Sequence, residues 1–189
     1  MLLRRIILGG LLGMMLSTSL SAKGILRENE ILVSDLKGMR AELADAPKWV
    51  FEDPKVPYEE MGVAYIPIDN KYLGIEQATL NAKMSMIVIF HEVFTRYRKR
   101  FAEQFHESDE TVTKVGYSFY NYLVTKIQVA DTYTNMKAGV AVVKIKLEGC
   151  QIEQIKRYLK ASVENLNDNE VGYIAKIVLK ELGNVCVLR

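Results

Sequence analysis

The longest regular pattern in the chain is a helical one that runs from Gly74 to His106. Apolar residues recur there at intervals of three or four, and the segment contains no proline and no internal glycine. This spacing predicts a single helix of about eight to nine turns. The stretch from Met84 to Phe94 is apolar on nearly every side, whereas residues 96–107 are amphipathic and heavily charged. We therefore expect the helix to be covered on two faces, by a sheet on one and by another helix or a second subunit on the other.

Shorter segments also carry apolar residues at helical spacing. Ala46 and Pro47 end the first of them, because the residue before a proline is disfavoured in the α conformation. Ser108 provides a cap from which a helix can restart, and Gly183 with Asn184 closes the last segment. The spacing predicts four further helices, at residues 25–44, 110–129, 151–164 and 170–182.

Alternation of apolar and polar residues predicts a small β-sheet. Its clearest signal lies at residues 139–147, where the period of two is typical of a half-buried strand. Residues 61–68 and 130–135 are predicted as shorter strands, and residues 47–51 as an extended piece that holds the only tryptophan. This order of elements is typical of an α+β fold, with a small antiparallel β-sheet packed against one long helix and flanked by other helices.

Residues 1–22 have the three parts of a secretory signal peptide. Arg4 and Arg5 form its charged start, an apolar stretch follows, and small residues lead up to Ser21 and Ala22. The apolar stretch has about half the length that a membrane span needs. We expect cleavage after Ser21 or Ala22 and export to the periplasm or the extracellular space. No cysteine stands at the cleavage site, so we expect no N-terminal lipid anchor and no transmembrane span.

The expected cleavage changes the charge of the chain. The 189 residues include 25 Lys and Arg against 23 Asp and Glu, and Arg4 with Arg5 account for the whole excess. The exported chain is then formally neutral, which argues against nucleic acid as a partner. With 49% hydrophobic residues it can form a real core. We divide it into a signal peptide (1–22), an N-terminal helix and linker (23–45) and a single α+β domain (46–189).

Cys150 and Cys186 are the only cysteines of the chain. Two cysteines in an oxidising compartment are compatible with one disulfide between them. Two alternatives stay open at this point. Cys186 lies close to the C-terminus and could bridge to another chain, or Cys150 could be a small buried residue and Cys186 a free thiol.

The residues that usually carry catalysis do not form a recognisable motif. His91 with Glu92 starts a near match to the zinc-protease pattern, but Thr95 stands where the second zinc ligand is needed. His106 is about 22 Å further along the same helix, too far to share a metal with His91. We therefore predict a non-enzymatic protein with no cofactor and no metal site. A hydrolase site formed by His106, Asp109 and Glu110 is the alternative.

Two groups of side chains are candidates for protein contacts. Basic residues cluster on the charged half of the long helix, where a merely solvated surface is the alternative interpretation. The second group consists of aromatic residues, Tyr117, Phe119, Tyr120, Tyr122 and Tyr133. One narrow buried stripe cannot hold so many rings, so we expect some of them to face a partner chain or a groove. The predicted interaction surface comprises Arg96, Arg98, Arg100, Tyr117, Tyr120 and Tyr133.

Four short motifs stand out along the chain: Ala46-Pro47-Lys48-Trp49-Val50, the strand around Gly62, the helix start Gln77-Ala78-Thr79-Leu80-Asn81-Ala82-Lys83, and the strand 139–147 followed by a helix. Together they resemble the LPP-twenty-like family of twenty-kilodalton envelope proteins of epsilonproteobacteria. The resemblance implies a small α+β domain without catalysis. Members of this family include surface antigens, a secreted dimeric cytokine inducer and a flagellar disk protein that assembles into rings.

Two departures from the family pattern affect the interpretation. The family's lipoproteins carry a cysteine at the cleavage site, which this chain lacks, and Met84, Met86 and Phe90 make the helix start bulkier than is usual. We therefore predict an exported, non-enzymatic envelope protein that acts by self-association, as a homo-oligomer, or by binding protein partners. A periplasmic component of the flagellar motor is one setting, and a secreted effector or adhesin is the alternative.

Overall fold

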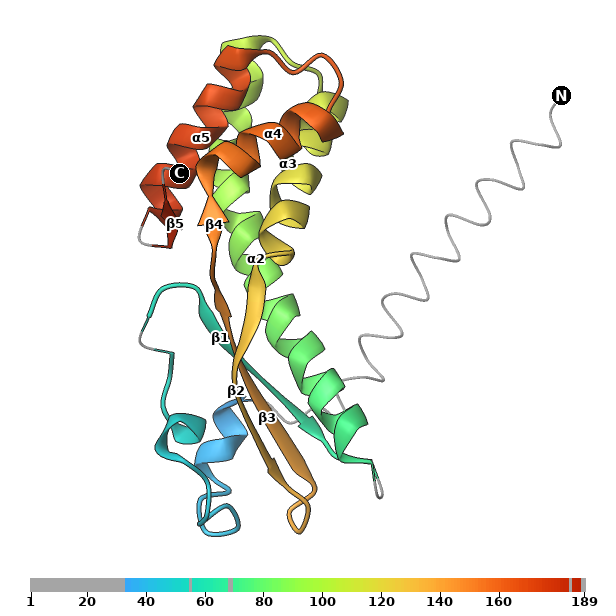
Figure 1. Cartoon of the computed structure of the whole chain (residues 1–189), viewed down its shortest axis with the longest axis vertical. Coiled ribbons are helices and arrows are strands. Elements are labelled where there is room, and N and C mark those ends of the chain that lie inside the picture. Colours follow the sequence, from blue (N-terminus) through green and yellow to red (C-terminus); the bar gives the residue numbers. More distant parts are fainter. Residues whose placement is uncertain (1–32, 55, 68–69, 184, 188–189) are drawn as a thin grey trace, which may run out of the picture.

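The computed structural model describes residues 33–54, 56–67, 70–183 and 185–187 (Figure 1). The expected signal peptide and the first part of the predicted helix 25–44 lie outside the described residues. The fold is α+β, as predicted: a three-stranded antiparallel sheet packs against one long helix, α2 (Lys71–Phe105). Figure 1 shows α2 as the spine of the molecule, with the sheet along its first half and the other helices around its second half.

The long helix begins three residues earlier than predicted and ends one residue earlier. Asn70 caps its start, because the Asn70 side-chain oxygen accepts a hydrogen bond of 3.2 Å from the backbone N–H of Leu73. His106 ends it in the left-handed conformation, with φ 55°. The cap satisfies a backbone donor that the first turn of a helix would otherwise leave unpaired.

Helix α3 (Asp109–Val124) returns along α2 and is shorter than predicted. The predicted helix extended to residue 129, but strand β2 (Ile127–Asn135) already starts at Ile127, opposite Leu147 of strand β3 (Val140–Leu147). Cross-strand hydrogen bonds outweigh the helical spacing of these residues, so the prediction was wrong at this boundary. Two further helices, α4 (Ile152–Ser162) and α5 (Asp168–Leu182), match their predicted positions within two residues.

The sheet has the strand order β1-β3-β2, with β1 at Glu59–Tyr65. Strand β1 runs antiparallel to β3, from Glu59 opposite Lys146 to Tyr65 opposite Val140. On the other side of β3, β2 carries an irregularity between Val129 and Asp131. The central strand is therefore paired on both sides, which explains why it has the clearest strand signal in the sequence.

The sheet separates two hydrophobic cores. One face of β3 packs against α2, and the opposite face, including Val140 and Val142, is covered by Leu36 and Leu43 from the N-terminal segment. The strand is thus buried on both faces at this end, beyond the half-burial that we predicted. Leu36 and Leu43, which lie in the range predicted as N-terminal helix and linker (23–45), thus contribute to the core of the domain.

Residues 33–51, the first that the structure describes, do not form the elements that we predicted. Where we expected an α-helix, Val33–Lys37 form a 3₁₀ turn, labelled η1. Further turns follow it along the chain. Lys48–Phe51 form a second 3₁₀ turn, η2, where we expected an extended piece, because the N–H of Val50 donates to the carbonyl of Pro47 at 3.0 Å. Short turns place Leu36, Leu43 and Val50 on the sheet as well as a helix would.

Helix α2 lies directly on the backbone of β1 at Gly62. A Cβ atom at Gly62 would lie 1.9 Å from the carbonyl oxygen of Ala78 and 2.4 Å from the backbone nitrogen of Ala82. Both neighbours are backbone atoms, which cannot move aside as a side chain can. The contact between helix and sheet therefore requires a residue without a side chain at position 62.

Replacing Gly62 by alanine is expected to push α2 away from the sheet. We predict that Gly62→Ala lowers the free energy of unfolding by about 3 kcal/mol, as overpacking of a rigid contact does. Urea unfolding followed by circular dichroism measures the change. Gly172→Ala in α5 is the matched control, because a Cβ at Gly172 would meet no atom within 4 Å. The control should be neutral or stabilising, and an equally stable Gly62→Ala variant would contradict the close contact.

Candidate interaction surface

The first half of α2 exposes large apolar side chains on the side that faces away from the sheet. Leu73 is 49% exposed, Leu80 56%, Met84 59% and Val88 54%. These residues recur at helical spacing and so share one side of the helix. We call this side the outer face of α2, defined by Leu73, Gln77, Leu80, Met84, Ile87, Val88 and His91. We predicted a cover on this face, and within the described residues no element lies over its first half.

Two tyrosines of α3 continue the outer face at its far end. The ring of Tyr120 lies 6.0 Å from that of His91, and the ring of Tyr117 lies 5.6 Å from that of Tyr120. Tyr117 is 59% exposed. Burial, and then the neighbouring Tyr117, raise the pKa of the Tyr120 hydroxyl above its ordinary value. Both tyrosine rings lie beside an apolar helix, a combination that is enriched where proteins bind each other.

Tyr133 does not join this surface. It lies on β2, packs against the second core and donates a 2.7 Å hydrogen bond to the carboxylate of Asp45 in the N-terminal segment. Phe119 and Tyr122 are buried in the main core. Of the five rings that we grouped from the sequence, only Tyr117 and Tyr120 lie together at the surface.

The predicted basic cluster divides between two sides of α2. Arg96 forms a 2.8 Å ion pair with Glu181 of α5, whereas Arg98 contacts α3 through Thr113 at 3.3 Å and Asp109 at 3.6 Å. Neighbouring residues of a helix point about 100° apart, so a run of basic residues cannot form one flat patch. Arg100 is exposed on the same helix. Arg96 and Arg98 tie α2 to its neighbouring helices.

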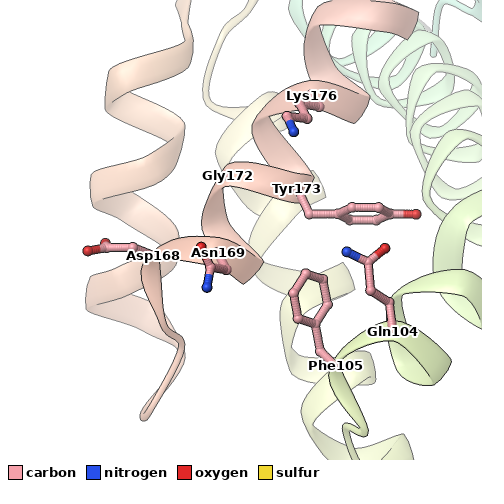
Figure 2. Close-up of a pocket in the computed structure, with 7 residues that line it drawn as sticks. All are labelled: Gln104, Phe105, Asp168, Asn169, Gly172, Tyr173 and Lys176. Carbon is pink, nitrogen blue, oxygen red and sulfur yellow. The ribbon is translucent and has the colours of Figure 1, made fainter.

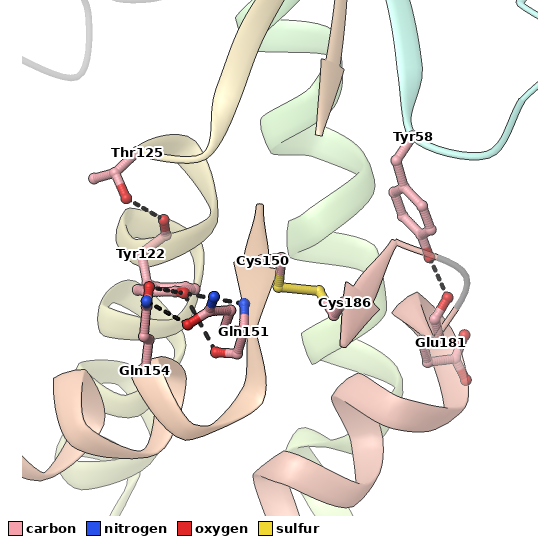
Figure 3. The surroundings of a disulfide bond; sticks show 8 residues. All are labelled: Tyr58, Tyr122, Thr125, Cys150, Gln151, Gln154, Glu181 and Cys186. Atoms are coloured by element: carbon pink, nitrogen blue, oxygen red, sulfur yellow. Dashed lines mark hydrogen bonds between the residues drawn. A yellow bond between two sulfur atoms is a disulfide. The ribbon is translucent and has the colours of Figure 1, made fainter. Parts of the chain in front are cut away.

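The structure joins Cys150 to Cys186 within the chain, with the two sulfur atoms 2.03 Å apart (Figure 3). The bond connects two strands of two residues each, β4 (Cys150–Gln151) and β5 (Cys186–Val187), which pair in parallel. We did not predict these strands, since two residues carry no periodicity. The cysteines are 36 residues apart, and closing a loop of that length restricts the unfolded chain by about 4 kcal/mol in the chain-entropy model.

Hydrogen bonds surround the disulfide on both sides (Figure 3). The Tyr122 hydroxyl lies 3.3 Å from the carbonyl oxygen of Gln151, and the Tyr58 hydroxyl donates to the carbonyl of Glu181 at 2.6 Å. Burial and the charge of Glu181 raise the pKa of Tyr58, so it stays protonated as a donor. The disulfide therefore joins β4 to β5, while the two hydrogen bonds tie α3 to β4 and the residue before β1 to α5.

Hollows at the surface bring polar and charged side chains together near the ends of the helices. One of about 380 Å³ lies between the end of α2 and the start of α5 (Figure 2), where the rings of Phe105 and Tyr173 are 5.6 Å apart. Asp168 lines it too, but its carboxylate is paired with Lys160. Its chemistry is that of a polar, open depression.

The candidate hydrolase residues do not meet in one pocket. Glu110 lines a separate hollow of about 360 Å³ and forms a 2.8 Å ion pair with Lys114, while neither His106 nor Asp109 lines that hollow. The described part of the chain contains no group of three or more His, Cys, Asp or Glu residues placed to hold a metal ion. Among the described helices, none has the length and apolar character needed to cross a membrane.

One acidic residue is buried, and no pattern in the sequence indicated its burial. Glu170 in the first turn of α5 is 1% exposed, and its carboxylate accepts a 2.6 Å hydrogen bond from the backbone N–H of Asn167 in a capping box. Burial raises the pKa of Glu170 above its ordinary value of 4.5, and a hydrogen bond and the charge of Glu107 raise it further. The folded protein therefore holds a proton here more tightly than the unfolded chain does.

This raised pKa predicts a stability that depends on pH. The contribution of Glu170 is fully present below its ordinary pKa and is lost as the pH rises through the raised value in the folded protein. We predict that Glu170→Gln, which keeps the capping acceptor without the charge, is more stable than the wild type near pH 7 and loses this advantage at about pH 4. Thermal unfolding across this range measures it, with Glu103→Gln on the exposed surface as control. Parallel pH curves for Glu170→Gln and the wild type would refute the assignment.

Comparison with protein-family models and with characterised proteins finds no match to this chain. The outer face of α2 and the two adjoining tyrosines therefore stand as the candidate site on geometry alone. Sequence reasoning found Tyr117 and Tyr120, and it found the apolar circumference of α2. It missed that Leu80 and Met84 lie at the surface, because apolar residues all round a helix do not reveal which side a sheet covers.

Proposed function

We propose that this protein is a non-enzymatic, exported protein of the cell envelope that works by binding protein through the outer face of α2 and the adjoining Tyr117 and Tyr120. The observation that carries the proposal is the row of Leu73, Leu80 and Met84, each about half exposed on one side of the same helix. Contiguous apolar side chains at the surface of a protein are typical of a binding surface.

Three further observations support this function. The N-terminal sequence has the organisation of an export signal, and the disulfide between Cys150 and Cys186 suits an oxidising compartment. In the hollows described above, the carboxylates of Asp168 and Glu110 are paired with Lys160 and Lys114. The resemblance to the LPP-twenty-like family adds the flagellar motor as the setting to test first, through the motility of a deletion strain.

A photo-crosslinking amino acid tests the binding surface in the native host. We expect a residue of this kind at Tyr117 to form a defined product with a protein of the envelope fraction. Tyr65 is the matched control, since it is also a tyrosine, 54% exposed, and lies on β1. The product from position 117 should exceed that from position 65 several-fold, because only position 117 adjoins the outer face.

Two results would contradict the proposed function. Equal yields from the two positions would show that Tyr117 marks no binding surface. A chain that stays in the cytoplasm with its N-terminus uncleaved, as shown by the mass of its N-terminal peptide, would contradict a function in the cell envelope.

A further inference from the structure

The outer face of α2 has the spacing of a coiled-coil seam. Six of its seven residues, all except Val88, follow one another at alternating intervals of four and three, and a seam of this spacing faces a second helix. None of the six positions carries an Asp, Glu, Lys or Arg side chain. The seam consists of Leu73, Gln77, Leu80, Met84, Ile87 and His91, and as a helix it is about 27 Å long.

The same seam continues into the second half of α2, where the chain itself supplies the partner helix. Phe94 and Arg98 are the next two positions at this spacing, and both contact α3. Phe94 is 4% exposed, and its ring lies 6.0 Å from that of Phe119. Gly116 makes this approach possible, since a Cβ there would lie 2.7 Å from the Phe94 ring. One half of a continuous seam thus holds an antiparallel helix, and the other half presents the same pattern to solvent.

We infer that a second copy of this chain covers the free half of the seam, with the two α2 helices antiparallel and centred on position 82. In this register Leu80 of one copy faces Met84 of the other, and Gln77 faces Ile87. The inference rests on the proposed function and names the partner at that surface.

The position of α3 sets the antiparallel direction. Beyond His91, α3 occupies the line of the seam through its contacts with Phe94 and Arg98. Two parallel α2 helices would bring both α3 helices to the same end and be forced apart there. In the antiparallel pair, each α2 begins at Lys71, and this first turn lies beside the α3 helix and Tyr120 of the other copy.

Residues 23–32 of the same chain are too few to cover the whole seam as a helix. Ten residues separate the expected cleavage after Ala22 from Val33, and as a helix they would span about 15 Å of the 27 Å seam. Val33 also packs against the second core, on the sheet face opposite α2. The segment would have to pass around the sheet before it could cover any of the seam.

Sedimentation or light scattering of the exported form, residues 23–189, tests the inference. We expect the mass of two chains, and a dissociation constant that Leu80→Glu raises at least about 30-fold, as loss of a central apolar contact does. Tyr72→Glu is the matched control: Tyr72 is 70% exposed on the same helix, one residue away from the seam position Leu73. It should leave the dimer intact, and circular dichroism should show that both variants fold.

A second variant tests the seam without weakening the protein. Gln77→Leu adds an apolar side chain opposite Ile87 of the other copy and should tighten the dimer about tenfold. A wild-type dimer that Leu80→Glu leaves unchanged overturns the inference. So does a monomeric wild type, or a monomer that dimerises only after residues 23–32 are removed. If a monomeric wild type still crosslinks to an envelope protein through position 117, the proposed function stands and only the self-association is refuted.

Discussion

The arrangement of the whole molecule depends on how closely α2 approaches the sheet at Gly62. The helix backbone at Ala78 and Ala82 lies where a side chain of β1 would otherwise be. Contact at this distance buries only small residues between helix and sheet, and Gly74, Ala78 and Ala82 are the buried positions of the first three turns. The close approach fixes the direction of α2, and with it the positions of α3 and α5, which pack on its second half.

This constraint also explains why large apolar side chains remain at the surface. A narrow contact made of glycine and alanine covers little of the circumference of a helix, so Leu80 and Met84 point away from the sheet. In the second half of α2 the inward residues are large, including Phe90 and Phe101, and helices of the same chain surround them. One helix therefore combines a filled half and an open half, and the open half carries the spacing of a helix-binding seam.

Much of this fold could be predicted from the sequence, because periodicity reports directly on long elements. The α+β class, the long helix and the central strand follow from spacing alone. The spacing of Leu36 and Leu43 was misleading, since successive turns can bury them on the sheet as a helix would. Strands β4 and β5 could not be predicted, because a disulfide between distant residues holds them in place.

The candidate site was only partly predictable, for reasons of geometry. Closeness in sequence grouped Tyr133 with Tyr117, but the chain changes from helix to strand between them and carries Tyr133 to the second core. The run of arginines on α2 points to two neighbouring helices because each residue turns about 100° from the last. The side of α2 that is exposed to solvent is decided by the close contact with the sheet at Gly62. A pattern of hydrophobic residues does not reveal such a contact.

A distance measured between two copies distinguishes an antiparallel pair of α2 helices from a parallel pair and from a monomer. A spin label on a cysteine introduced at exposed Thr95 reports on one position per chain, because both native cysteines are held in the disulfide. Antiparallel helices centred on position 82 place the two labels about 40 Å apart, at 1.5 Å per residue. Pulsed electron paramagnetic resonance should give this distance, and Leu80→Glu should abolish it. A distance below about 20 Å, typical of parallel neighbours, or the absence of any intermolecular distance would contradict the account.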